Sequence, residues 1–153
     1  MANRKPTVLG GCQCGGTRYA LFAAPSDASI CHCRMCQKAS GNYFMALAVV
    51  KRDEFAWTRD RPGTFRSSEL VERDFCVKCG TPLTYRPLDV DCISVTIGSL
   101  DDPGAAHLQR QYGVESAVID LAGAAELPAI TTDEWANPER LAKLTSRQHP
   151  DHE

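Results

Sequence analysis

Two short cysteine pairs decide how this chain folds: GGCQCGG at residues 10–16 and FCVKCGT at residues 75–81. Cys12 and Cys14 are two residues apart, so an extended segment would point both thiols to the same side. Cys76 and Cys79 flank a two-residue turn, and Gly80 allows the main chain to fold back towards the sulfurs. Neither pair can complete a tetrahedral site alone, whereas together they offer four thiolates, the usual ligands of a structural zinc. We therefore predict one zinc ion that joins an N-terminal strand to the middle of a sheet.

Three other roles remain open for these four cysteines. They could be unrelated buried residues, although two separate short-spaced pairs argue against this. The CxxC motif could be a redox pair, but no βαβ pattern surrounds it, and Cys12 and Cys14 would then have no purpose. Four thiolates would also hold iron. Zinc remains the favoured interpretation.

A third motif, CHCRMCQKASG at residues 31–41, combines the CxC and CxxC spacings, so a strand-to-helix turn can aim three sulfurs at one point. Cys31, Cys33 and Cys36 would leave a tetrahedral ion with a vacant fourth position, as in catalytic zinc sites. A thiol bound there would lose its proton more readily, and a carbonyl would be polarised. We predict a second zinc, suited to carbon–sulfur chemistry and at partial occupancy if three thiolates release it more easily than four.

The second motif could instead form another structural zinc site, with His32, His107 or Cys92 as the fourth ligand. His32 would point away from its neighbours in an extended segment, towards solvent or behind the ligands. Cys92 lies in an alternating strand pattern, where a small buried side chain is the commoner role. Iron–sulfur binding is disfavoured because the four-cysteine spacing of ferredoxins is absent from the sequence.

The length and charge of the chain narrow the class of protein. We expect a single domain over residues 1–145 and a frayed tail over residues 146–153. The net charge of −2, with acids and bases interspersed, predicts no nucleic-acid partner and no membrane-binding patch. The longest apolar run, residues 44–50, is too short to span a bilayer, and no secretory signal is visible near the N-terminus. We therefore expect a cytoplasmic protein whose clustered thiols are reduced and bind metal.

Strand patterns dominate the sequence. Apolar, aromatic and β-branched segments, separated by turn signals, are GTRYALF (16–22), NYFMALAVV (42–50), FAWT, GTFRS, LVERDF, PLTYR, CISVTIG and HLQRQY. Helices are predicted only after Cys33, ending near Gly41, and near the C-terminus, where Asn137 would cap and Leu141 and Leu144 would face inward. The fold is therefore predicted to be mainly β, with antiparallel sheets and short helices near the second metal site and the C-terminus.

Four motifs, in this order, resemble the glutathione-dependent formaldehyde-activating enzyme family, also called the GFA or CENP-V domain: GGCQCGGTRY, CHCRMCQKASG, SSELVERDFCVKCGTPL and IGSLDDP. The resemblance covers residues 10–111 and implies an Mss4-like fold of antiparallel sheets pinned by zinc. It also implies a structural zinc on Cys12, Cys14, Cys76 and Cys79, and a second zinc on Cys31, Cys33 and Cys36. The reaction associated with the family is the addition of glutathione to formaldehyde, giving S-hydroxymethylglutathione.

We therefore expect a zinc-dependent carbon–sulfur lyase, similar to S-(hydroxymethyl)glutathione synthase, that condenses a thiol such as glutathione with formaldehyde or a related small aldehyde. The alternative is a non-catalytic zinc module that binds or carries glutathione or another thiol. A chromosomal interaction role, known in one branch of the family, would be expected to need a basic extension that the sequence does not show. The sequence identifies no general base, although His32, Lys38, Ser40 and Asn42 lie near the second motif.

Overall fold

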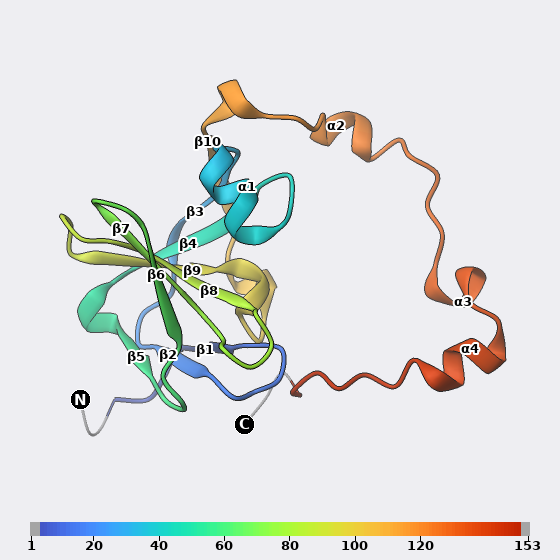
Figure 1. Cartoon of the computed structure of the whole chain (residues 1–153), viewed down its shortest axis with the longest axis horizontal. Coiled ribbons are helices and arrows are strands. Elements are labelled where there is room, and N and C mark those ends of the chain that lie inside the picture. The colour runs from blue at the N-terminus through green and yellow to red at the C-terminus, as the bar shows by residue number, and fades with distance from the viewer. Residues whose placement is uncertain (1–3, 151–153) are drawn as a thin grey trace.

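The computed structural model describes residues 4–150, in which β-strands predominate. The strands are β1 (Val8–Gly11), β2 (Arg18–Leu21), β3 (Ser26–Cys31), β4 (Met45–Lys51), β5 (Phe55–Trp57), β6 (Gly63–Ser68), β7 (Val71–Phe75), β8 (Pro82–Pro87), β9 (Cys92–Thr96) and β10 (Leu108–Tyr112). They form a three-stranded sheet in the order β1-β2-β5 and a seven-stranded sheet in the order β10-β3-β4-β9-β8-β7-β6 (Figure 1). The mainly β prediction is confirmed.

Most neighbouring strands run antiparallel, as the short turns between them require. The pair β10 and β3 is parallel, with Tyr112 opposite Cys31, so the predicted antiparallel architecture includes one parallel pair at the edge of the large sheet. Parallel pairing is open to β10 because about 75 residues of chain separate it from β3, far more than the dozen a crossover needs. This edge pairing holds the end of β3, where the second cysteine motif begins.

The two faces of the seven-stranded sheet have different roles because side chains alternate along each strand. On one face, Ala48, Val50, Ile93 and Val95 are buried against the small sheet. There they join the fully buried Tyr19, Leu21 and Leu83, with Phe55 and Trp57 packed around them. The opposite face carries Met45 and Leu47, which pack with Cys36 in a second, smaller cluster. We call these the core face and the cysteine face.

Short helices occupy the connections. They are α1 (Arg34–Ser40), α2 (Leu121–Ala124), α3 (Thr132–Trp135) and α4 (Pro138–Lys143), with 3₁₀ turns η1 (Arg52–Glu54), η2 (Ile97–Ser99), η3 (Pro103–Ala105) and η4 (Val114–Ser116). Helix α1 ends at Gly41, whose φ of 62° is a left-handed C-cap, as predicted. Helix α4 begins as predicted, because the Asn137 side chain accepts a hydrogen bond from the Arg140 amide. Within residues 4–150, no helix is long and apolar enough to cross a membrane.

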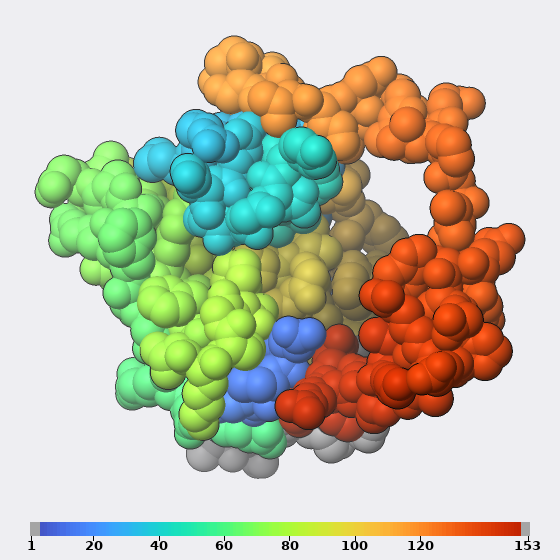
Figure 2. All heavy atoms as spheres, turned by 45° about the vertical axis from the view of Figure 1, so that its right-hand side comes forward, coloured from blue at the N-terminus to red at the C-terminus, as the bar shows by residue number. Residues whose placement is uncertain are grey.

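The segment from α2 to α4 forms an arm that stands away from the sheets and returns towards the β1 end of the molecule (Figure 1). In the space-filling view an opening separates much of this arm from the body (Figure 2). Leu141 is partly buried, but Leu144 is 50% exposed, so the prediction that it faces inward is wrong. Of the predicted tail, residues 151–153 lie outside the described part, and the His149 amide donates to the Gln13 carbonyl at 2.8 Å.

Candidate metal centres

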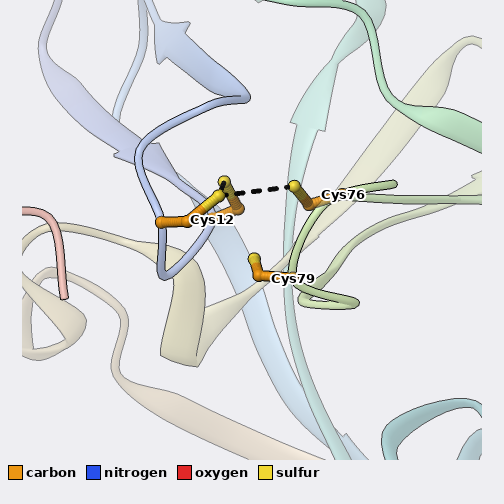
Figure 3. A group of neighbouring side chains, drawn as sticks. Cys12, Cys76 and Cys79 are labelled. Atoms are coloured by element: carbon orange, nitrogen blue, oxygen red, sulfur yellow. Dashed lines mark hydrogen bonds between the residues drawn. The ribbon is translucent and has the colours of Figure 1, made fainter. Parts of the chain in front are cut away.

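The first candidate centre, which we call the closed group, consists of Cys12, Cys14, Cys76 and Cys79. Their Sγ atoms all lie within 4.8 Å of one another. The Cys14 Sγ is 3.5 Å from the Cys12 Sγ and 3.8 Å from the Cys76 Sγ. Figure 3 shows the side chains of Cys12, Cys76 and Cys79 pointing towards a common region. Sulfurs in a disulfide would be about 2.05 Å apart, so these are free thiols.

The spacing of the closed group suits a tetrahedral metal ion. With metal–sulfur bonds of about 2.3 Å, tetrahedral geometry separates neighbouring sulfurs by about 3.8 Å. Both of the Sγ distances to Cys14 lie near this value. Thiolates are soft ligands that favour zinc or iron over magnesium or calcium. The closed group could therefore hold one such ion.

A turn, rather than a strand, brings Cys12 and Cys14 together. Strand β1 ends at Gly11, and the Gly15 amide donates to the Cys12 carbonyl at 3.0 Å. The prediction of an extended segment is therefore wrong at this point. The physical reason is Gly15, whose φ of 71° is a left-handed conformation that glycine adopts without steric cost. The Thr17 amide also donates to the Cys12 Sγ at 3.2 Å, so the turn supplies main-chain donors to sulfur.

The second half of the closed group is the predicted turn between β7 and β8. The Gly80 amide donates to the Cys76 carbonyl at 2.9 Å, and Gly80 has a φ of 78°. Burial raises the pKa of Cys79, but the Thr81 hydroxyl and the amides of Thr81 and Cys14 outweigh it and lower this pKa to about 6. These donors therefore favour the Cys79 thiolate, whereas the neighbouring thiols raise the pKa of Cys14 to about 11.

The second candidate centre, which we call the open group, consists of Cys31, Cys33 and Cys36. Cys31 ends β3, Cys33 precedes the first residue of α1, and Cys36 lies within α1. The three Sγ atoms lie within 4.8 Å of one another, so the predicted strand-to-helix turn does bring them together. Within residues 4–150, these two groups are the sets of three or more candidate ligands that could hold a metal ion.

A buried arginine lies against the open group. The Arg73 side chain is only 6% exposed, and its Nη2 donates to the Cys36 Sγ at 3.4 Å. Its Nη1 contacts the Met45 Sδ at 3.3 Å and its Nε donates to the Ser67 Oγ at 3.3 Å. Burial raises the pKa of Cys36, and the Arg73 guanidinium partly offsets this by favouring the thiolate. Arg73 thus places a buried positive charge against the Cys36 sulfur, where it would compensate negative charge on the open group.

Tyr85 lies beside Arg73 on the cysteine face. The register places Phe65, Arg73 and Tyr85 opposite one another across β6, β7 and β8. The Arg73 guanidinium stacks 4.8 Å from the centre of the Tyr85 ring, and Tyr85 packs against the cluster that contains Cys36. Burial raises the pKa of Tyr85, so its hydroxyl stays protonated at neutral pH and is available as a hydrogen-bond donor.

The structure places the three candidate fourth ligands outside the open group. His32 is 1% exposed, and its Nε2 pairs with the Gln111 Oε1 at 2.8 Å. A solvent-exposed His32 is therefore ruled out, and the residue links the open-group turn to β10. His107 is exposed, and Cys92 is a free thiol at the start of β9. Neither belongs to a candidate metal group among the described residues.

The residues suggested as neighbours of the second motif have other roles. The Ser40 hydroxyl lies within hydrogen-bond distance of the carbonyls of Cys36, Gln37 and Phe44, at the C-terminal end of α1, and can donate to one of them at a time. Lys38 and Asn42 are exposed, and the Asn42 side chain accepts a hydrogen bond from the next amide, that of Tyr43. Sequence analysis instead missed Arg73 and Tyr85. The sequence shows only that Arg73 and Tyr85 lie in two strands on either side of the CxxC motif. The pairing of β7 with β8 is what places the two side chains next to each other.

The fold and the two groups together define a mainly β protein with two cysteine centres that could each hold a metal ion. The model of the family described as glutathione-dependent formaldehyde-activating enzyme (GFA) matches residues 7–115, and the chain belongs to this family. The match ends shortly before the arm begins. It includes all seven cysteines of the closed and open groups.

Two relatives illustrate the range of the similarity. An uncharacterized lyase of Schizosaccharomyces pombe is 29% identical over 80 residues, which are 52% of this chain and 58% of that protein. A Rhodobacter sphaeroides protein of known crystal structure superimposes with a TM-score of 0.54 at 18% identity, covering 67% of this chain and 98% of that chain. The second likeness supports the fold alone.

Proposed function

We propose that this protein is a zinc-dependent carbon–sulfur lyase-type enzyme that condenses a thiol, such as glutathione, with a small aldehyde, such as formaldehyde, at the open group. The observation that carries the proposal is the convergence of three thiols beside a buried guanidinium, with Tyr85 next to it. Three protein ligands leave one position for a substrate. The family to which the chain belongs, and the description of its Schizosaccharomyces pombe relative as a lyase, support the same reaction class.

The cofactor in this proposal is two zinc ions per chain, one in the closed group and one in the open group. The closed group would hold its ion with four thiolates and leave no position for a substrate. The open group would hold the second through Cys31, Cys33 and Cys36, with partial occupancy because it offers fewer ligands. The cytoplasm, where thiols are kept reduced, is the compartment that suits these centres.

The proposed step is an addition in which all atoms of both substrates are retained. The thiol sulfur forms a bond to the aldehyde carbon, the C=O π electrons move to oxygen, and that oxygen takes the proton the thiol has lost. Zinc in the open group would supply a Lewis acid with one open position, where it would lower the pKa of a bound thiol or polarise a bound aldehyde. Arg73 compensates the thiolate charge, and the protonated Tyr85 hydroxyl can donate to the oxygen as its charge develops.

The test follows glutathione and formaldehyde by NMR exchange spectroscopy with and without the zinc-loaded protein. We expect faster exchange with wild type and with Cys92→Ser, which alters a cysteine outside both groups, and no acceleration with Cys36→Ser. If wild type leaves the exchange rate unchanged, the protein does not catalyse this reaction. Saturable glutathione binding without acceleration would favour the binding module instead.

A further inference from the structure

A pocket of about 260 Å³ opens beside the open group, on the cysteine face. Its walls are mostly apolar and come from α1, β4, β6, β7, the turn at Gly80 and the start of β8. The residues that matter below are Met45, Phe65, Arg73, Asp74, Phe75 and Pro82. Arg73 connects the pocket to the open group, because this residue lines the pocket and its Nη2 contacts the Cys36 Sγ. The pocket is therefore one side chain away from the proposed reaction centre.

Two phenyl rings in this pocket are exposed, although most large apolar side chains of the sheets are buried or partly buried. Phe65 is 63% exposed and Phe75 is 36% exposed. Neighbouring exposed aromatic rings at the edge of a pocket are typical of sites that bind an apolar group. Arg73 and Asp74 bring one charge of each sign to the lining, and both already have partners. The Arg73 donors contact Ser67, Met45 and Cys36, and the Asp74 carboxylate accepts from Thr64, Thr84 and Arg86.

The size and chemistry of the pocket do not match formaldehyde or the charged ends of glutathione. A water-sized molecule occupies about 30 Å³ in the liquid, and formaldehyde is only slightly larger, so it would leave most of the pocket empty. Placing a carboxylate against Phe65, Phe75 and Pro82 would desolvate its charge without a free partner. An apolar substituent, by contrast, would cover both phenyl rings.

We propose that the aldehyde that reacts at the open group carries an alkyl or aryl substituent, held between Phe65, Phe75, Pro82 and Met45. The inference rests on the proposed function and narrows its substrate class. The carbonyl carbon would lie towards Cys36, Arg73 and Tyr85, and the substituent would point away from them along the pocket. The addition itself is unchanged, since the substituent takes part in no bond.

The experiment compares formaldehyde with phenylacetaldehyde as partners of glutathione. We expect the enzymatic kcat/KM to be at least tenfold larger for phenylacetaldehyde, because a bound phenyl group contributes several buried carbons. Phe65→Ser should lower the phenylacetaldehyde value about tenfold and reduce the ratio of the two values. The matched control is Leu70→Ser, which changes a side chain that is 56% exposed and does not line the pocket.

A non-reacting probe separates the two proposals. Binding of 2-phenylethanol, followed by ligand-observed NMR, should weaken at least threefold in Phe65→Ser and not in Leu70→Ser. If the protein accelerates the formaldehyde reaction but 2-phenylethanol binds equally well to wild type and Phe65→Ser, the proposal of an alkyl or aryl substituent is wrong and the proposed function stands. Acceleration of neither aldehyde would overturn the proposed function, and Phe65-dependent probe binding would then still support an apolar-ligand pocket.

Discussion

The closed and open groups are built from the same side chain but differ in how the chain brings their members together. In the closed group Cys14 and Cys76 are 62 residues apart, so a metal ion there would clamp two distant turns. The open group lies within the six residues 31–36, and the turn between β3 and α1 already holds it. A metal in the closed group would therefore contribute more to folding, since it would close a long loop.

The surroundings of the closed and open groups also differ. The closed group receives hydrogen bonds from main-chain amides and from the Thr81 hydroxyl, which hold thiolates in place. The open group faces a buried guanidinium, a phenol and an apolar pocket on the cysteine face. A pocket lined by Cys12 and Thr81 also lies beside the closed group, so the two groups differ in the guanidinium and the phenol rather than in the presence of a pocket. We therefore assign a folding role to the closed group and a chemical role to the open group, and experiments can test this division.

The largest effect is expected from Cys76→Ser. The change removes a ligand that is 1% exposed from the closed group and leaves three thiols that must hold the two turns together. Because metal binding and folding are coupled, we expect insoluble or zinc-poor protein. Soluble expression and metal content per chain are the measurements. A soluble variant with its full zinc content would show that the closed group does not support the fold.

Cys36→Ser should be milder. The open-group turn is held by β3, α1 and the pairing of β3 with β10, so it does not depend on a metal for its position. We expect the zinc content to fall from two ions per chain to one while the circular dichroism spectrum stays that of wild type. Two ions remaining would show that Cys36 is dispensable as a ligand, and a loss of folding would remove the division between the two groups.

The sequence alone predicted each short-spaced cysteine motif because the spacings within it are local, whereas the two closed-group pairs, 62 residues apart, were joined because neither could complete a tetrahedral site alone. It also predicted α1, since Gly41 ends the helix through its own backbone conformation. The placement of Arg73 and Tyr85 could not be predicted, because it depends on which strands pair and in which register. The parallel pairing of β10 with β3 is another non-local choice. The Cys12 turn was missed because alternation was assumed to continue past β1, where Gly15 ends it.

Arg73→Met tests whether charge around the open group matters. The variant keeps much of the apolar bulk of the side chain but leaves Cys36 without its N–H donor and the three thiolates without a buried cation. Losing a hydrogen bond to a metal ligand typically lowers metal affinity about 10- to 100-fold, and we expect this at the open group alone. Competition with a chelator measures it. Arg73→Lys, which keeps the charge, should bind the metal with an affinity between those of Arg73→Met and wild type. Equal metal affinity in all three proteins would show that Arg73 does not support the open group.

The smallest effects are expected from a matched pair of glycine changes. Gly41 ends α1 with a φ of 62° and Gly80 ends the Cys76 turn with a φ of 78°, and an added Cβ would meet no atom within 4 Å at either position. Alanine therefore tests backbone strain alone, which should lower the free energy of unfolding by about 1 kcal/mol. The thermal midpoint should fall by about 2–4 °C in both variants.

The two glycine variants should differ in which metal they release. Strain in the Gly80 turn bears on the hydrogen bond from its amide to the Cys76 carbonyl, so Gly80→Ala should speed zinc loss from the closed group. Gly41 ends α1, which contains no cysteine of the closed group. Gly41→Ala should therefore leave zinc release from the closed group at the wild-type rate. Timed release to a chelator separates the two ions. Identical release curves in both variants would mean that the two centres respond as one unit, and the comparison between a folding site and a chemical site would fail.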